Sequence, residues 1–172
     1  MYKTFETERL HIRPVELEDA PFIFELLNTP KWIQYIGDRN VRSVKDAENY
    51  IREKMIPQLE RLGYGNYAVI RKSDQAKIGT CGLYDREGLI GVDIGFAFLP
   101  AFEKQGYGAE ASKKVLNACR ENFGLVKVSG ITTKENLGSQ RLLEQLGLRF
   151  KETVTLPGET EVLWLYELEL GV

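Results

Sequence analysis

The sequence predicts one mixed α/β domain over residues 1–172, with a central sheet and helices on both of its faces. Three observations support this fold class. Strand-like and helix-like patterns follow one another in the order β-α-α-β-β-β-α-β-α-β-β, and short turns typical of antiparallel hairpins join the three consecutive strands. A chain of 172 residues is also long enough to bury a sizeable core.

The N-terminal part contains a strand and two helices. Alternating polar and apolar residues predict the strand, and clustered apolar residues together with a capping serine predict the helices. In chain order we expect a strand at 7–13 ended by Pro14, a helix at 16–27, an aperiodic segment at 31–42, and a helix capped by Ser43 that reaches about residue 61.

The rest of the chain contains most of the strands. Turn-forming residues at 73–75 and 85–88 separate the first three strand-like runs, and Gly124 and Gly147 each end a helix. In chain order we expect strands at 66–72, 77–84 and 89–99, a helix at 106–123, a strand at 126–133, a helix at 136–146, and strands at 149–156 and 161–170.

A glycine loop between a strand and a long helix is the most informative stretch. Gly106 and Gly108 stand two apart directly before the helix. The unpaired N–H groups and the dipole of a helix start attract anions, and glycine lets a phosphate approach the backbone. An ordinary glycine-rich cap is the alternative, and glycines two apart do not decide between the two interpretations.

Composition excludes several classes of function. A net charge of −2 gives no basic surface for nucleic acid, and no apolar run approaches the roughly 20 residues of a membrane span. The first residues lack the apolar core of a signal peptide. Cys81 and Cys119 are expected to be reduced core residues of a cytoplasmic protein, and His11 a surface or satisfied strand residue. We expect no metal site.

Several short motifs occur in a recognisable order. They are Thr7–Pro14 with Glu18–Ala20, Ile78-Gly79 with Gly82-Leu83, Asp93–Phe96, Gln105–Ala111, and Asn136 and Ser139 followed by Leu142–Leu148. With these motifs the chain resembles, over nearly its whole length, the GNAT superfamily of acyl-CoA-dependent N-acyltransferases. Within it the chain is most similar to the ribosomal-protein N-terminal acetyltransferases of RimJ/RimL type.

The resemblance implies a cofactor and the residues that hold it. Two strands, 89–99 and 126–133, would splay apart so that the pantetheine arm of acetyl-CoA pairs with the first like an added strand. Asn136 would hydrogen-bond the pantetheine, although an Asn at a helix start is also a common N-cap. The cofactor-binding residues implied are Phe96, Ala97, Phe98, Lys104, Gln105, Gly106, Tyr107, Gly108, Ala109, Asn136 and Ser139.

The resemblance also implies catalytic roles. An amine that attacks a thioester needs a base, a polarised carbonyl and a proton donor for the thiolate. Leu143 stands where much of the superfamily has a tyrosine acid, so Ser139 is the candidate donor, or simply a residue of the first helical turn. Asp93 stands where the branch often has glutamate. It would act as base through a water, or be a solvated strand residue that bridges to a basic partner. Glu103 and Lys104 depart from the usual phosphate loop.

Trp32 and Tyr35 are the candidate acceptor-binding residues, because an aromatic segment between two helices suits a binding loop. Trp32 could equally fill the core. We therefore expect an N-acetyltransferase that acetylates a protein N-terminus or a small amine, with a homodimer as a possible state. A non-catalytic acyl-CoA-binding module is the alternative. A nucleotide-binding domain is disfavoured because the chain lacks the Gly-Lys-Ser/Thr sequence of a P-loop.

Overall fold

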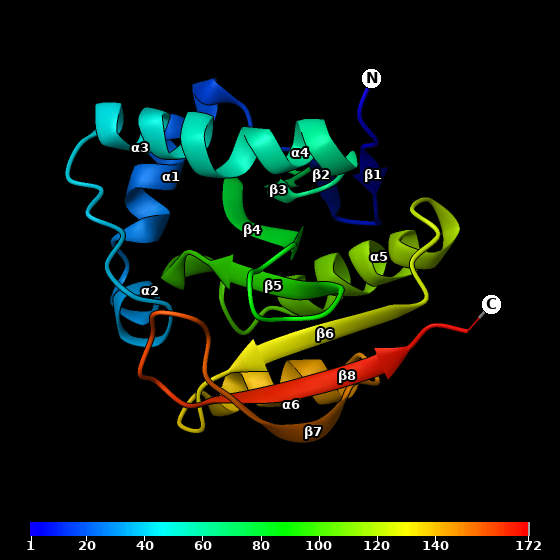
Figure 1. Ribbon diagram of the computed structural model, residues 1–172. Helices are drawn as coiled ribbons and strands as arrows, with labels where there is room; N and C mark the ends of the chain where they lie inside the picture. The colour runs from blue at the N-terminus through cyan, green and yellow to red at the C-terminus, as the bar shows by residue number, and fades with distance from the viewer. Residues whose placement is uncertain (172) are drawn as a thin grey trace.

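A single eight-stranded sheet forms the centre of the computed structural model, which describes residues 1–171 (Figure 1). The strand order is β1-β2-β3-β4-β5-β6-β8-β7, and all neighbours are antiparallel except β5 and β6. The predicted mixed sheet is therefore confirmed. The strands are β1 Phe5–Glu6, β2 Leu10–Pro14, β3 Asn66–Arg71, β4 Lys77–Tyr84, β5 Val92–Phe98, β6 Lys127–Thr132, β7 Arg149–Val154 and β8 Leu163–Glu169.

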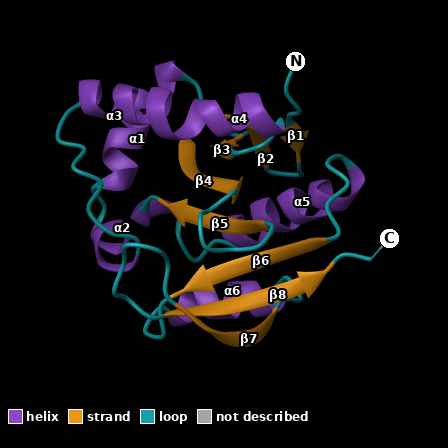
Figure 2. Ribbon diagram, in the orientation of Figure 1, coloured by secondary structure: helices purple, strands orange, loops and turns teal. Residues whose placement is uncertain are grey.

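Helices cover both faces of the sheet, as the sequence predicted (Figure 2). On β3, Tyr67 and Val69 belong to the core beneath α5, whereas Ala68 between them packs with α1 and α3 on the other face. α6 lies on the same face as α5 and contributes Leu143 to that core. The helices are α1 Ala20–Leu27, α2 Pro30–Tyr35, α3 Val44–Tyr50, α4 Ile56–Leu62, α5 Tyr107–Glu121 and α6 Leu137–Gln145.

The segment after α1 differs from the prediction. An aperiodic stretch was expected at 31–42, but its first part forms α2. The Thr29 hydroxyl accepts a hydrogen bond from the Trp32 N–H, and Pro30 occupies the first helical position, where its missing N–H costs nothing. A helix this short leaves no hydrophobic period to read, so its caps were the only signal in the sequence.

Two other helices also depart from regular α geometry. The helix expected at 16–27 starts with the 3₁₀ turn Leu17–Asp19, and α1 begins at Ala20. Between α3 and α4 the chain forms the π-helical segment Ile51–Met55. Pro57 follows this wide turn, and a proline that lacks an N–H and clashes with the preceding turn accounts for the local widening.

The parallel pair β5–β6 separates after its first residues. Only Val92 and Asp93 of β5 pair with β6, opposite Val128 and Ser129. β5 nevertheless stays paired with β4 as far as Phe98, and β6 stays paired with β8 to its last residue. The facing edges of β5 and β6 are thus unpaired over the rest of their lengths, and a gap opens inside the sheet.

Both cysteines are buried core residues, as expected, with Cys81 on β4 and Cys119 on α5. Within residues 1–171, no helix has the length and apolar character needed to cross a membrane.

Candidate active site

The gap between β5 and β6 exposes backbone hydrogen-bonding groups of β5. The Leu99 N–H donates to the Ile78 carbonyl at 2.9 Å, which fixes the side on which this strand bonds β4. Alternate residues of a strand direct their N–H and C=O groups to the same side, so those of Phe96 and Phe98 point into the gap. Ala97, between them, bonds on the β4 side, where it lies opposite Thr80.

The loop that follows β5 carries a row of backbone N–H groups for which the described residues offer no acceptor. Lys104 and Gly106 have φ of +60° and +84°, and this left-handed geometry turns the chain sharply into α5. Within the described chain, the N–H groups of residues 104–109 donate to no carbonyl or side-chain oxygen. The first helical bond comes from the Glu110 N–H to the Gly106 carbonyl, at 3.1 Å. The helix dipole adds positive potential at this point.

Arg9 and Glu110 hold this loop in place. The Arg9 guanidinium donates to the Gln105 carbonyl at 3.0 Å and to the Glu110 carboxylate at 2.8 Å, and it lies 4.2 Å from the centre of the Tyr107 ring. The Thr7 hydroxyl also donates to Glu110. The Thr7–Arg9 motif therefore fastens the start of α5 to the turn between β1 and β2. The sequence showed this motif but not its partner a hundred positions away.

The two unusual loop residues, Glu103 and Lys104, leave no unbalanced negative charge beside the loop. The Glu103 carboxylate accepts from the Lys31 ammonium of α2 at 2.6 Å, so its charge is balanced by a cation. The Lys104 side chain is exposed to solvent. Free N–H groups and an unpaired strand edge are the donors and acceptors that a diphosphate joined to an amide-bearing arm requires, and the site fits acetyl-CoA on this ground.

At the start of α6, Asn136 acts as a helix cap. Its side-chain oxygen accepts from the Ser139 N–H at 3.2 Å, while the other end of the amide has no partner within residues 1–171. Ser139 is partly buried in the first turn. Leu143 is 1% exposed and packs against Gly130 of β6. The position where the superfamily often has a tyrosine therefore belongs to the core of this protein.

Asp93 lies where β5 and β6 part, and the residue is 1% exposed. The Arg86 Nε donates to both of its carboxylate oxygens, at 2.9 and 3.1 Å. Burial raises the pKa of Asp93 to about 6, although the Arg86 charge opposes the shift. Of the two alternatives from the sequence, the bridge to a basic partner is present, but the residue is buried and not solvated. A carboxyl with this pKa is suited to proton transfer near neutral pH.

The candidate acceptor residues lie on α2. Trp32 packs partly into the core formed with α1 and α3, and its buried indole Nε1 has no hydrogen-bond partner among the described residues. Tyr35 is partly exposed one turn later. Because Lys31 pairs with Glu103, α2 lies beside the end of β5, where the gap opens.

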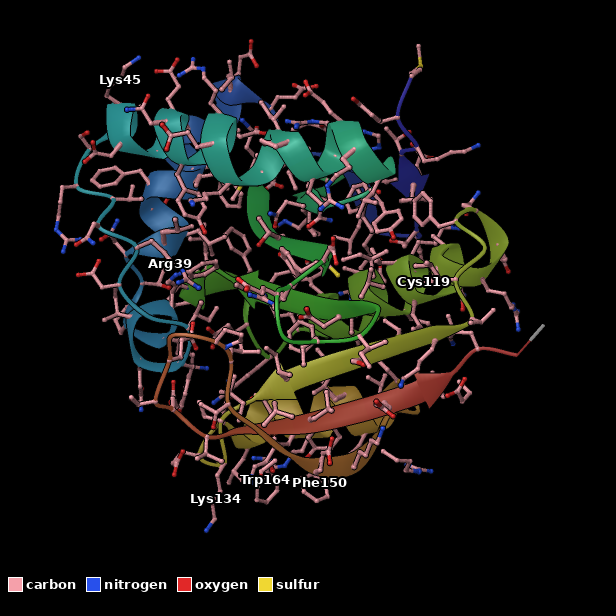
Figure 3. The ribbon with its side chains drawn as sticks, in the orientation of Figure 1. Arg39, Lys45, Cys119, Lys134, Phe150 and Trp164 are labelled. Carbon is pink, nitrogen blue, oxygen red and sulfur yellow. The ribbon has the colours of Figure 1, made fainter. Side chains whose placement is uncertain are left out.

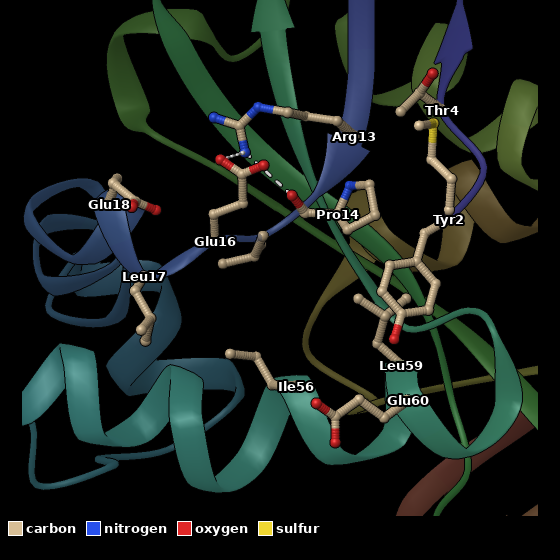
Figure 4. A pocket seen from close by; sticks show the side chains of 12 residues that line it. Tyr2, Thr4, Arg13, Pro14, Glu16, Leu17, Glu18, Ile56, Leu59 and Glu60 are labelled. Atoms are coloured by element: carbon tan, nitrogen blue, oxygen red, sulfur yellow. Dashed lines mark hydrogen bonds and ion pairs between the residues drawn. The ribbon is translucent and has the colours of Figure 1, made fainter.

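A hollow elsewhere in the molecule contains none of these residues. It measures about 440 Å³ and lies between the N-terminal segment, the end of β2 and α4 (Figure 4). Tyr2, Pro14, Leu17, Ile56 and Leu59 give it a mainly apolar lining. It is separate from the β5–β6 gap, and the backbone groups of the gap, not this hollow, define the candidate site.

The fold and this arrangement define an acyltransferase, and comparison with known proteins identifies the family. The chain belongs to the family described as Acetyltransferase (GNAT) domain, whose model matches residues 9–149. It is 25% identical over 150 residues to the uncharacterized N-acetyltransferase YoaA of Bacillus subtilis (strain 168), covering 87% of this chain and 84% of that protein. It is 29% identical over 153 residues to the uncharacterized N-acetyltransferase p20 of Bacillus licheniformis, covering 86% and 83%.

Solved structures agree on the fold. A GNAT-family acetyltransferase from Bacillus anthracis superposes with a TM-score of 0.79 at 22% identity, covering 97% of this chain and 98% of its own. A RimL ribosomal L7/L12 alpha-N-protein acetyltransferase in complex with coenzyme A has a TM-score of 0.81 at 14% identity, with coverage of 97% and 98%. The predicted family, fold class and enzyme class are confirmed.

Proposed function

We propose that this protein transfers an acetyl group from acetyl-CoA to a primary amine by direct attack of the amine in a ternary complex. The observation that carries the proposal is the gap between β5 and β6, which opens beside the unbonded N–H groups of residues 104–109. Acetyl-CoA supplies an activated acetyl thioester. The protein supplies the groups that hold it and move protons.

Backbone groups would make most of the contacts with acetyl-CoA. The N–H groups of residues 104–109 would bind the pyrophosphate, with Gln105, Tyr107 and Ala109 contributing main-chain donors between and beside the glycines. Phe96 and Phe98 would extend the sheet toward the arm. The Phe98 N–H, at the open end, is the proposed donor that polarises the thioester carbonyl.

Two side chains would handle protons. Asp93 would take the proton of the incoming ammonium through a water, and its burial gives it a pKa suited to this work. Ser139 would donate a hydrogen bond to the departing thiolate from the first turn of α6. Leu143 offers no hydroxyl for this purpose.

The acceptor is proposed to be a protein N-terminal amine or a small-molecule amine that enters beside Trp32 and Tyr35. The fold shared with ribosomal-protein acetyltransferases supports the first class, and the RimJ/RimL branch is proposed on the same ground. A cytoplasmic location and a homodimer are part of the proposal, and sedimentation velocity would test the dimer.

An acceptor screen tests the proposal. Purified protein is incubated with acetyl-CoA and a panel of polyamines, amine antibiotics and peptides with free N-termini. Thiol release is followed, and the acetylated product is identified by mass spectrometry. We expect thiol release that requires both the amine and the protein. Binding of acetyl-CoA without turnover of any acceptor would instead support the alternative, a non-catalytic acyl-CoA-binding module.

A further inference from the structure

Two adjacent threonines at the end of β6 have buried side-chain hydroxyls. Thr132 is 6% exposed and Thr133 is 4% exposed, and neither Oγ1 has a hydrogen-bond partner within residues 1–171. A buried hydroxyl that gives up its hydrogen bonds to water loses stability unless another group replaces them. Such groups therefore need a partner from outside the chain, either a buried water or a bound molecule.

Their place in the fold indicates which molecule. Thr132 is the last residue of β6, where this strand faces β5 across the gap. The residues that follow turn outward: Lys134 and Glu135 are exposed, and Figure 3 shows the Lys134 side chain projecting from the edge of the molecule. The chain is thus buried as far as the two threonines at the open end of the gap and exposed directly after them.

The other buried side-chain polar atoms without a partner strengthen this localisation. Four such atoms occur in the described chain: Trp32 Nε1, Tyr67 Oη, Thr132 Oγ1 and Thr133 Oγ1. The other two are scattered, because Trp32 lies on α2 and packs with α1 and α3, and Tyr67 lies in the core between β3 and α5. Of the four, the two threonines alone are adjacent, and they lie at the open end of the gap.

The backbone directs the two side chains toward opposite faces of the sheet, both from the β6 side of the gap. Thr132 lies opposite Trp164 of β8 and shares its face with Gly130, which contacts Leu143 of α6. Successive residues of an extended chain alternate in direction, so Thr133 points toward the other face. The Thr133 carbonyl is fixed by the Asn136 N–H at 3.2 Å and the Gln140 side chain at 3.1 Å.

We propose that the hydroxyls of Thr132 and Thr133, both on the β6 side of the gap, hydrogen-bond the acyl-pantetheine arm of acetyl-CoA, one from each face of the sheet. The inference rests on the proposed function, which puts that arm between β5 and β6. A hydroxyl can donate to an amide or thioester carbonyl and accept from an amide N–H, and the arm carries all of these groups. The two threonines would thereby set the depth to which the thioester enters.

Valine substitutions test this assignment because valine keeps the shape of threonine and removes the hydroxyl. Thr132→Val and Thr133→Val are compared with wild type for the melting temperature of the free protein and for the dissociation constant of acetyl-CoA by calorimetry. We expect an unchanged or higher melting temperature, because an unpaired polar group is removed, together with acetyl-CoA binding weakened about 3- to 10-fold for each variant.

Three controls define the outcome. Tyr67→Phe removes the buried hydroxyl remote from the gap and should leave acetyl-CoA binding unchanged. Thr132→Ser and Thr133→Ser keep the hydroxyl and should bind acetyl-CoA within about 3-fold of wild type. An adenosine bisphosphate that carries the nucleotide of coenzyme A without its arm should bind wild type and the valine variants alike.

Three results would overturn the inference. Unchanged acetyl-CoA affinity in both valine variants would assign the hydroxyls to internal water. A melting temperature lowered by several degrees would show that the hydroxyls have partners within the protein. Equal weakening of the armless nucleotide would show a general distortion of the site. If wild type does not bind acetyl-CoA at all, the proposed function fails, and this outcome is distinct from the other three.

Discussion

At the scale of single residues, two buried aspartates show how the same side chain serves different purposes. Asp93 accepts fewer hydrogen bonds than Asp19, and burial raises its pKa to about 6. Burial acts on Asp19 in the same direction, but hydrogen bonds from Arg13, the Glu16 N–H and Lys77 lower its pKa to about 2. Asp19 is therefore a structural anion, whereas Asp93 can exchange a proton near neutral pH.

The role of Asp93 predicts a pH profile. Because only the ionised carboxyl accepts a proton, turnover should rise as pH increases through about 6 and then level off. Asp93→Asn should lower turnover by about 100-fold or more while acetyl-CoA binding changes little. Asp93→Glu, which keeps the carboxyl group, is the matched control and should keep measurable activity. An Asp93→Asn variant with wild-type turnover would remove Asp93 from the mechanism.

Asp19 predicts acid sensitivity of the fold. Its native pKa is about 2, below the ordinary value of 3.8, so its stabilising effect is present above that ordinary value and is lost as pH falls toward 2. Between about pH 5 and about pH 2, the free energy of unfolding measured by urea denaturation should fall by about 2 kcal/mol because of this group. Asp93 has the opposite sign, because its ionisation between about pH 4 and 6 lowers stability. In the Asp19→Asn variant, the free energy of unfolding should fall less as the pH is lowered over this range. A fall equal to that of wild type would contradict this account.

One substitution separates the two roles of Asn136, the helix cap and the hydrogen-bond donor to the pantetheine arm. Asn136→Asp keeps the oxygen that accepts from the Ser139 N–H and removes the amide donor. If the donor binds the pantetheine arm, acetyl-CoA affinity should fall about 10-fold with little change in melting temperature. A variant with wild-type affinity would leave Asn136 as a helix cap only.

At the scale of elements, the glycine loop depends on its backbone geometry. Gly106 has φ of +84°, so alanine there should destabilise the fold by about 1 kcal/mol and disturb the N–H groups of the loop. We expect acetyl-CoA to bind at least about 10-fold more weakly, as measured by calorimetry.

Gly63→Ala is the matched control, because Gly63 has φ of +82° at the end of α4 with no atom within 4 Å of an added Cβ. It should cost similar stability and leave acetyl-CoA affinity unchanged. Equal affinity in the Gly106 and Gly63 variants would contradict the assignment of the loop.

At the scale of the whole molecule, local patterns predicted most of the fold. The alternation of β2, β3 and β4, the glycine loop and the caps of α3, α5 and α6 are all properties of neighbouring residues, and the structure places these elements within a few positions of their predicted ranges. Short or irregular segments were not predicted. α2 is too short to show a hydrophobic period, and the π-helical segment depends on Pro57.

The site was harder to predict than the fold because its interactions join distant residues. Arg86 with Asp93 lies within one hairpin, but Arg9 with Glu110 and Lys31 with Glu103 are pairs that only the folded chain brings together. The hydroxyls of Thr132 and Thr133 were also invisible in the sequence, where nothing distinguishes them from ordinary strand residues. Burial without a partner is a property of the packed structure alone.

The central claim is that the β5–β6 gap and the loop at residues 104–109 together hold acetyl-CoA, and backbone amide resonances test it residue by residue. Isotope-labelled protein is titrated with acetyl-CoA and its amide chemical shifts are followed by NMR. The account predicts the largest shift changes at residues 104–109 and at Phe96 and Phe98. Changes concentrated at the hollow beside Tyr2 and Leu59, with the loop and the gap unaffected, would contradict it.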